Sequence, residues 1–320
     1  MEVLRVDRDR PDPEAIAAAA DALRAGGLVA FPTETVYGLG ADARREDAVR
    51  ALFAAKGRPA DNPLIVHVAD ADGLPAVAAS VPPLAARLAE RFWPGPLTLV
   101  VDAGPAVPAV TTGGLATVAV RVPHHPVALA LLLAAGLPVA APSANRSGRP
   151  SPTTAAHVLH DLGDARVDLV LDAGPAAIGI ESTVVDARGD QPVILREGAI
   201  TREALGGAAS APGSSASPGT RHRHYAPSCP VEIVPAGEGV RRARALTRAG
   251  RRVGLVGAED AGDGVATLAV VDGAAALART LYEALRAAEA AAVDVVVVEA
   301  VPEAGIGRAV MDRLRRAAAG

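Results

Sequence analysis

Short apolar segments of strand length alternate with segments of helical period along most of this chain. Residues 28–31 (LVAF) are typical of a buried strand, whereas residues 46–56 place apolar side chains on one face of a helix that ends before Gly57. The same alternation continues toward the C-terminus, for example in the apolar strand pattern of residues 293–299. Strands that alternate with crossover helices form an α/β sheet, and we expect its strand directions to be mixed.

A shift in composition divides the chain near residue 208. Residues 208–218 (AASAPGSSASP) lack apolar periodicity, which is typical of a flexible connection. We therefore predict a larger N-terminal domain over residues 1–207, a linker over residues 208–229 and a small α/β domain over residues 230–320. The strand and helix order of the last segment is typical of a Rossmann-like, doubly wound domain.

Composition narrows the class of protein. Half of the residues are hydrophobic and 21% are charged, which indicates a packed globular chain. The formal net charge of −4 argues against a broad surface for nucleic-acid phosphates. A single cysteine, Cys229, can form neither an internal disulfide nor a Cys-rich zinc site. With no signal-peptide pattern and no apolar run long enough to span a bilayer, we expect a cytoplasmic protein without membrane association.

Lysine is almost absent from the chain. Of 32 basic residues, only Lys56 is a lysine. In such a chain, arginine supplies the ordinary positive charges of the surface. A single lysine therefore suggests that its position needs a compact ammonium group, which a planar guanidinium group cannot replace. The alternative is that the lysine stands there by chance, or only because a positive charge is favourable in the last turn of a helix.

Polar residues gather around the ends of the predicted N-terminal strands. PTETVYGLG occupies residues 32–40, KGRP with DNPLIVH covers residues 56–59 and 61–67, and PSANRSGRPS covers residues 142–151. Ligands of open α/β sheets bind at the carboxyl ends of strands, where loop amides can hold anions. Such a site predicts a polyanionic small ligand, most simply a nucleoside triphosphate. The basic side chains that would add positive charge are Lys56, Arg58, Arg121, Arg149 and Arg196.

Each of these residues also has a plain structural interpretation. Asn62 and Ser143 could be turn residues, and His67 alternates within an apolar strand as a core histidine would. The chain has no phosphate-loop motif, no dinucleotide-binding glycine fingerprint, no nucleophile elbow and no acidic cluster with metal-ligand spacing. Ordinary kinases, dehydrogenases and hydrolases are therefore disfavoured, and only the joint placement of the polar residues favours a site.

Several motifs together resemble the YrdC-like threonylcarbamoyl-adenylate synthase family. They are residues 31–39 (FPTETVYGL), KGRP at residues 56–59 with NPL at 62–64, and Ser-Ala-Asn at residues 143–145. Residues 217–227 (SPGTRHRHYAP) resemble the linker of the long two-domain form, although Thr220 stands where that family often has Met. The C-terminal domain fits this form by size and element order only. The resemblance implies a YrdC-like N-terminal domain with a mixed, twisted sheet.

The resemblance also implies a reaction. Members of this family are nucleotidyltransferases that join L-threonine, bicarbonate and ATP into L-threonylcarbamoyl-AMP and release pyrophosphate. The product supplies the group for threonylcarbamoyladenosine modification of tRNA next to the anticodon, so a tRNA-directed threonylcarbamoyl transferase is the implied partner. Mg²⁺ would be bound mainly through ATP phosphates.

The resemblance divides the polar residues into two sets. The residues implied to bind ATP are Lys56, Arg58, Asn62, Thr117, Ser143, Asn145, Ser151, Arg196 and Tyr225. Those implied to bind L-threonine are Thr35, His67, Arg121, the backbone of Ala141, and Ser182. Lys56 and Arg58 are the candidates for stabilising the charge that develops during the reaction.

Other interpretations stay open at this point. A double-stranded RNA-binding module without synthase turnover is one, although the net charge and the lack of stacking aromatics weigh against it. Carbamoyl transfer in hydrogenase maturation would bring zinc-finger-like cysteines, which a chain with one cysteine lacks. The linker is either a lid over the nucleotide or a passive tether. The base for threonine's amine is either His67 or solvent.

Overall fold

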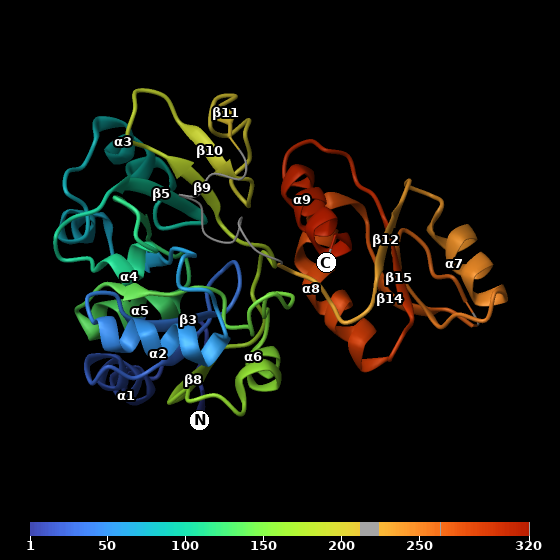
Figure 1. Ribbon diagram of the computed structural model, residues 1–320, viewed down its shortest axis with the longest axis horizontal. Helices are drawn as coiled ribbons and strands as arrows, with labels where there is room; N and C mark the ends of the chain where they lie inside the picture. Colours follow the sequence, from blue (N-terminus) through green and yellow to red (C-terminus); the bar gives the residue numbers. More distant parts are fainter. Residues whose placement is uncertain (212–223, 263, 320) are drawn as a thin grey trace. The chain divides into compact units, whose positions relative to one another are not determined.

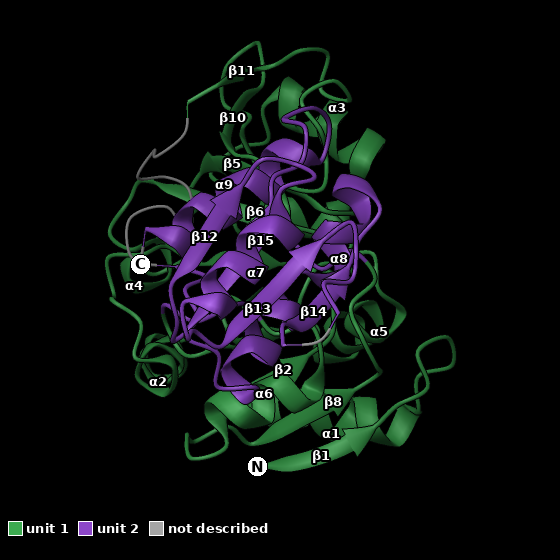
Figure 2. Ribbon diagram, turned by 90° about the vertical axis from the view of Figure 1, so that its right-hand side faces the viewer, with its two compact units in different colours: residues 1–147, 152–177, 181–221 green, residues 148–151, 178–180, 222–320 purple. Residues whose placement is uncertain are grey.

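The computed structural model describes residues 1–211, 224–262 and 264–319. They divide into two compact units (Figure 2). Unit 1 holds the described residues up to 211, except for two short segments, residues 148–151 and 178–180. Unit 2 holds these two segments together with the described residues from 224 onward.

Unit 1 is built on a mixed sheet of 11 strands among its described residues. The strand order is β1-β8-β2-β3-β7-β4-β6-β5-β9-β10-β11, and β5, β9 and β10 of this sheet are labelled in Figure 1. Pairs such as β4 with β6 are parallel, whereas pairs such as β5 with β6 are antiparallel, which confirms the predicted mixed α/β sheet. The strands are β1 (Glu2–Arg5), β2 (Val29–Phe31), β3 (Gly38–Asp42), β4 (Ile65–His67), β5 (Leu97–Asp102), β6 (Thr117–Arg121), β7 (Val139–Ala140), β8 (Leu169–Asp172), β9 (Thr183–Asp186), β10 (Val193–Arg196) and β11 (Ala209–Ser210).

Local sequence signals begin and end the helices of unit 1. Asp12 accepts a hydrogen bond from the Glu14 amide at 2.9 Å, and a proline occupies the first turn of the first helix. The second helix ends at Gly57, whose φ of 60° favours glycine. The helices of this unit are α1 (Pro13–Arg24), α2 (Glu46–Lys56), η1 (Ala71–Ala76), α3 (Pro83–Phe92), α4 (Ala109–Thr112), α5 (Pro126–Ala135) and α6 (Ala155–Leu162).

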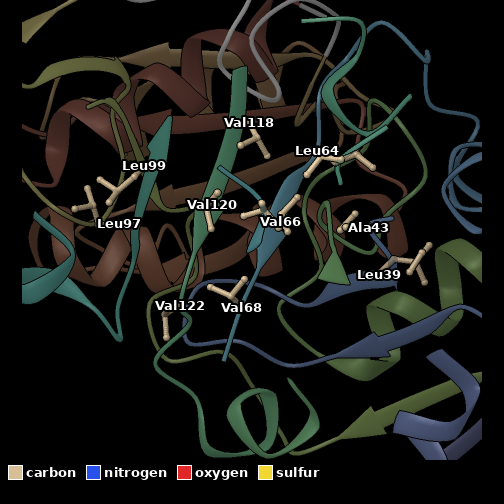
Figure 3. Packing of buried hydrophobic residues seen from close by; sticks show 14 of the residues in the cluster. Leu39, Ala43, Leu64, Val66, Val68, Leu97, Leu99, Val118, Val120 and Val122 are labelled. Atoms are coloured by element: carbon tan, nitrogen blue, oxygen red, sulfur yellow. The ribbon is translucent and has the colours of Figure 1, made fainter. Parts of the chain in front are cut away.

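Two buried apolar layers cover the sheet of unit 1. One contains strand residues such as Val66 and Val120, seen in Figure 3, together with Leu52 of α2. The other joins α1 and α5 to strands β2, β7 and β8 through residues such as Phe31 and Val139. With only 2% aromatic residues in the chain, both layers consist mainly of Ala, Val and Leu.

Unit 2 contains a parallel sheet of four strands among its described residues, in the order β12-β15-β13-β14. Helix α7 covers one face of this sheet, and α8 and α9 cover the other (Figure 1). This arrangement confirms the predicted doubly wound domain. Its elements are β12 (Val231–Val234), α7 (Gly239–Arg248), β13 (Val253–Gly257), β14 (Ala266–Val270), α8 (Gly273–Ala290), β15 (Val295–Glu299) and α9 (Gly307–Ala318).

No helix among the described residues is long and apolar enough to cross a membrane. The predicted linker, residues 208–229, begins with Ala209–Ser210, which pair with β10 as strand β11. Residues 212–223 of that linker lie outside the described residues.

Candidate active site

Lys56 joins the end of α2 to the Ser-Ala-Asn loop. Its side chain is buried, and Nζ donates to the backbone carbonyls of Ser143, at 2.5 Å, and of Asn145. Burial, followed by the positive charge of Arg58, holds the pKa of Lys56 well below its usual range. The Ser147 amide in turn donates to the Lys56 carbonyl at 2.9 Å. The lone lysine is therefore a buried connection between two of the predicted motifs.

The Ser-Ala-Asn loop follows β7 and is fixed by its own polar groups. The Ser143 hydroxyl donates to Asn145 Oδ1 at 2.5 Å, and Asn145 Nδ2 donates to the Arg146 carbonyl at 2.7 Å. The Ala144 amide donates to the Tyr37 carbonyl at 2.8 Å, which attaches the loop to the PTETVYGLG segment. Ser143 and Asn145 are thus brought beside the end of α2.

Arg58 and Asn62 belong to the turn between α2 and β4. Arg58 Nη2 donates to the Pro63 carbonyl at 3.0 Å, and Asn62 is fully buried. Asn62 lies before β4, and Thr117 is the first residue of β6, which runs parallel to β4. These residues lie at the amino ends of their strands, whereas ligands of open α/β sheets were expected at carboxyl ends.

Strands β4 and β6 place polar side chains on one face of the sheet. His67 pairs with Arg121 in the parallel register of the two strands. Paired residues point to the same side and every second residue of a strand shares a face, so His67, Arg121 and Thr117 lie on a common face. The buried apolar cluster on this face consists of the strand residues Ile65, Val100, Ala119, Val184 and Leu195.

Arg121 lies on this face and contacts three residues. Its Nε donates to the Gly95 carbonyl at 3.2 Å and its Nη1 donates to Thr35 Oγ1 at 3.0 Å. Its Nη2 lies 2.7 Å from Glu34 Oε2, and both side chains of this ion pair are buried. The Thr33 and Thr35 hydroxyls are bonded to each other at 2.8 Å. Three segments distant in sequence therefore meet at one guanidinium group.

A second polar group lies at β5, β9 and β10. The Thr98 and Ser182 hydroxyls are 2.7 Å apart and bonded. Arg196 Nη2 donates to the Ser182 carbonyl at 2.9 Å and to its hydroxyl at 3.2 Å. Arg196 comes from the predicted ATP set and Ser182 from the predicted threonine set, so the structure places members of the two sets in direct contact. The Ala141 amide, also from the threonine set, donates to the Ile65 carbonyl at 2.9 Å.

Ser151 and Tyr225 belong to unit 2. The Ala226 amide donates to the Gly148 carbonyl at 3.0 Å, which ties the segment after Tyr225 to the segment before Ser151. The Tyr225 ring stacks on Tyr282 of α8 with 5.5 Å between ring centroids. Three further residues of α8 and α9 contact these segments: Arg286 bonds the Pro150 carbonyl, Glu289 pairs with Arg149, and Arg313 lies 5.4 Å from the Tyr225 ring centroid. Both predicted ATP-binding residues of unit 2 are thus held on its helices.

Burial controls the protonation of two histidines. Burial, with a smaller contribution from the positive charge of Arg121, lowers the pKa of His67 to about 3. Burial also lowers the pKa of His125 to about 4. Both imidazoles are therefore neutral near pH 7. His67 can accept a proton only weakly, so the structure gives little support to His67 as the base for threonine's amine.

Because these two histidines are buried and neutral, we expect the free energy of unfolding to fall at mildly acidic pH. Their pKa values in the folded chain lie below the ordinary 6.5, so below pH 6.5 the unfolded chain binds more protons and the folded state loses stability as the pH falls. Each histidine is expected to cost about 2 kcal/mol between pH 7 and pH 5. Urea unfolding followed by the fluorescence of the only tryptophan, Trp93 in unit 1, measures this loss.

The controls are histidine-to-asparagine variants at the same two pH values. His67→Asn with His125→Asn is expected to remove most of the pH dependence. Equal stability of the unmodified chain at pH 7 and pH 5 would contradict the burial argument.

Sequence reasoning gave no role to Glu34 or Thr98. Both are buried polar residues that contact a predicted site residue. Glu34 stands between two predicted polar positions of the PTETVYGLG segment, a signal that could have identified it. Among the described residues there is no group of three or more His, Cys, Asp or Glu side chains that could hold a metal ion.

Known families match both parts of the chain. Residues 21–198 match the Sua5_yciO_yrdC model, described as "Telomere recombination". Residues 190–319 match the Sua5_C model, described as "Threonylcarbamoyl-AMP synthase, C-terminal domain". The threonylcarbamoyl-AMP synthase of Bacillus subtilis (strain 168) is 45% identical over 97% of this chain and 94% of its own. That of Pyrococcus abyssi (strain GE5 / Orsay) is 45% identical over 97% of this chain and 96% of its own.

Solved structures give the same result. P. abyssi Sua5 complexed with L-threonine superposes with a TM-score of 0.93 at 42% identity, covering 100% of this chain and 98% of that chain. Escherichia coli YciO matches 62% of this chain and 96% of its own, with a TM-score of 0.55 and 26% identity. The alternative of an RNA-binding module without turnover is not favoured, because the full-length relatives are named as synthases. The chain therefore belongs to the threonylcarbamoyl-AMP synthase family of enzymes, in its long two-domain form.

Proposed function

We propose that this chain makes L-threonylcarbamoyl-AMP from L-threonine, bicarbonate and ATP, with release of pyrophosphate. The observation that supports this most is the direct contact of Arg196 with Ser182, on a sheet that also carries the buried guanidinium of Arg121. One cation suits the phosphates of a nucleotide, and the other suits the carboxylate of an amino acid. The product would supply the group for threonylcarbamoyladenosine modification of tRNA, through a separate transferase in the cytoplasm.

The proposed site has a nucleotide half and an amino-acid half. Fixed donors and cations favour this division, because each half contains a buried arginine with hydrogen-bonding neighbours. The nucleotide half comprises Lys56, Arg58, Asn62, Thr117, Ser143, Asn145, Ser151, Arg196 and Tyr225. The amino-acid half comprises Thr35, His67, Arg121, the backbone of Ala141, and Ser182.

The proposed chemistry needs positioning more than covalent catalysis. Bicarbonate takes up a proton and loses water to give carbon dioxide, and threonine's neutral amine adds to it and releases a proton. An oxygen of the resulting carbamate then attacks the α-phosphorus of ATP while pyrophosphate leaves. Negative charge grows on the phosphate oxygens in that step, and fixed cations stabilise it. Lys56 and Arg58 are proposed for this role. The Lys56 ammonium has three donors, and two are bound to the Ser143 and Asn145 carbonyls, so at most one serves a phosphate oxygen.

Magnesium is proposed to enter as part of the Mg–ATP substrate. The described residues hold no group of three or more ligating side chains, so phosphate oxygens and water would supply most of its coordination. Fixed cations of the chain would then bind the phosphate oxygens that the metal leaves free.

Pyrophosphate release tests the proposed function. The purified full chain is incubated with Mg–ATP, L-threonine and bicarbonate, and each substrate is left out in turn. We expect release only when all three are present, and complete loss when EDTA removes Mg²⁺. Release that does not depend on threonine or bicarbonate would contradict the proposal, since it would indicate plain nucleotide hydrolysis.

A further inference from the structure

Glu34 is a buried carboxylate with few partners. It is 5% exposed and lies in the PTETVYGLG segment, between Thr33 and Thr35. Its Oε2 is 2.7 Å from Arg121 Nη2, but the two groups are not aligned as a hydrogen bond. Neither carboxylate oxygen accepts a hydrogen bond from any described residue.

Burying the Glu34 carboxylate in this way costs free energy, which a residue that served only as a counter-ion for Arg121 would not recover. An ionised carboxylate has about four acceptor sites, and buried carboxylates are ordinarily satisfied by several donors. An ion pair taken out of water is favourable only when additional hydrogen bonds satisfy its remaining lone pairs. Glu34 lacks such bonds within the described structure, so its oxygens are available to a donor beyond the described residues, such as a bound substrate.

Arg121 shows where that donor would come from. Each of its nitrogens already contacts the protein: Nε contacts Gly95, Nη1 contacts Thr35 and Nη2 contacts Glu34. A substrate carboxylate that binds an arginine with two parallel hydrogen bonds needs two of these nitrogens. The Nη2 donors make no hydrogen bond with any described residue, and Glu34 Oε2 lies 2.7 Å from this nitrogen. A threonine carboxylate that binds through Nη2 therefore competes with Glu34 for the same donors.

Displacement alone would leave the Glu34 carboxylate buried without a cation, which is strongly unfavourable. The α-ammonium group of threonine is attached to the carbon that also carries its carboxylate. It therefore arrives beside Arg121 as the substrate binds, with a positive charge and three hydrogen-bond donors. Arg121 then pairs with the carboxylate of threonine, and Glu34 pairs with its ammonium group. No buried charge is left without an opposite charge.

We infer that Glu34 binds the α-ammonium group of L-threonine, and that this contact replaces its ion pair with Arg121 when the substrate binds. This inference rests on the proposed function. It makes Glu34 a residue that selects α-amino acids: Arg121 would recognise the carboxylate, and Glu34 would recognise the ammonium group beside it.

The test compares L-threonine with (R)-3-hydroxybutyrate, which is the same molecule without its amino group. Both ligands are titrated calorimetrically into the full chain and into Glu34→Gln. We expect the unmodified chain to prefer threonine by about 100-fold, as for a buried charge pair. In Glu34→Gln we expect threonine to bind about 100-fold more weakly, while (R)-3-hydroxybutyrate binds as well as before or better because its carboxylate no longer competes with Glu34.

Other outcomes would overturn the inference. If Glu34 only orients Arg121, Glu34→Gln weakens both ligands by the same factor and the preference for threonine persists. If the unmodified chain binds no threonine at all, the proposed function fails as well. Threonine binding with an unchanged preference in the variant overturns only the role of Glu34.

Two further variants guard against a folding artefact. Glu299→Gln is a matched control, because Glu299 is another buried carboxylate, which accepts hydrogen bonds from the amides of Gly239, at 2.7 Å, and Ala258, at 2.9 Å, in unit 2. It is expected to leave both affinities unchanged. If Glu34→Gln does not fold, Glu34→Asp replaces it, because it keeps the charge but shortens its reach. That variant should weaken threonine at least 10-fold and spare (R)-3-hydroxybutyrate, and equal weakening of both ligands would contradict the inference.

Discussion

Arg121→Met is expected to lower the free energy of unfolding of unit 1 by about 3–5 kcal/mol, because it removes one partner of a buried ion pair and leaves the Glu34 carboxylate without its cation. The same variant should abolish threonine-dependent pyrophosphate release, since the proposed threonine site loses the guanidinium group that would bind the substrate carboxylate. Urea unfolding followed by Trp93 fluorescence measures the stability of unit 1, to which Trp93 belongs.

The matched control removes both charges at once. Glu34→Met with Arg121→Met replaces the ion pair by two apolar side chains, and such replacements are often neutral or stabilising. The double variant should therefore recover most of the lost stability but none of the activity. A single variant as stable as the unmodified chain would contradict this account, as would a double variant no more stable than Arg121→Met alone.

Lys56→Arg is expected to lower kcat by about 100-fold or more, although it keeps the positive charge. The Lys56 ammonium lies among the carbonyls of Ser143 and Asn145 in a site that leaves the side chain 2% exposed. A planar guanidinium group is larger and cannot point its donors at both carbonyls from the same place. It would displace the Ser-Ala-Asn loop and, with it, the proposed contacts to ATP. Initial rates of pyrophosphate release at saturating substrates measure the effect.

Two comparisons separate charge from position at Lys56. Lys56→Met keeps much of the side-chain volume without the charge, and it should lose about as much activity as Lys56→Arg. Arg50→Lys is the matched control, because Arg50 is an exposed residue of the same helix, paired only loosely with Glu46 at 3.3 Å. It should keep full activity. A Lys56→Arg enzyme with an unchanged kcat would show that the compact ammonium group is not required.

The sequence predicted elements well where local signals are strong. Helix α2 was expected over residues 46–56 and has these bounds, because an apolar face and a terminal glycine both specify it. The buried strand expected over residues 28–31 is strand β2, Val29–Phe31. Strand β3, Gly38–Asp42, was not predicted, because its sequence GLGAD contains no β-branched or aromatic residue. This strand is buried because it pairs with β2 and β7. Such pairing depends on the tertiary fold and cannot be predicted from the local sequence.

The candidate site shows the same limit. Local sequence singles out Lys56 as the only lysine, the Ser-Ala-Asn segment as a polar stretch after an apolar strand, and Arg121 as a charged residue at the end of another. The common face of His67, Thr117 and Arg121 depends on the register between β4 and β6, which belongs to the tertiary fold. The contact of Arg196 with Ser182 likewise depends on the neighbouring strands β9 and β10. The predicted domain boundaries and the roles of individual site residues stay predictions.

The most direct measurement is the mass of the product. The full chain is incubated with Mg–ATP, L-threonine and bicarbonate labelled with ¹³C, and the mixture is separated quickly and analysed by mass spectrometry. We expect threonylcarbamoyl-AMP one mass unit heavier than with unlabelled bicarbonate, in an amount that matches the pyrophosphate released. AMP and pyrophosphate without a product that contains the labelled carbon would contradict the account, as would hydrolysis of ATP to ADP.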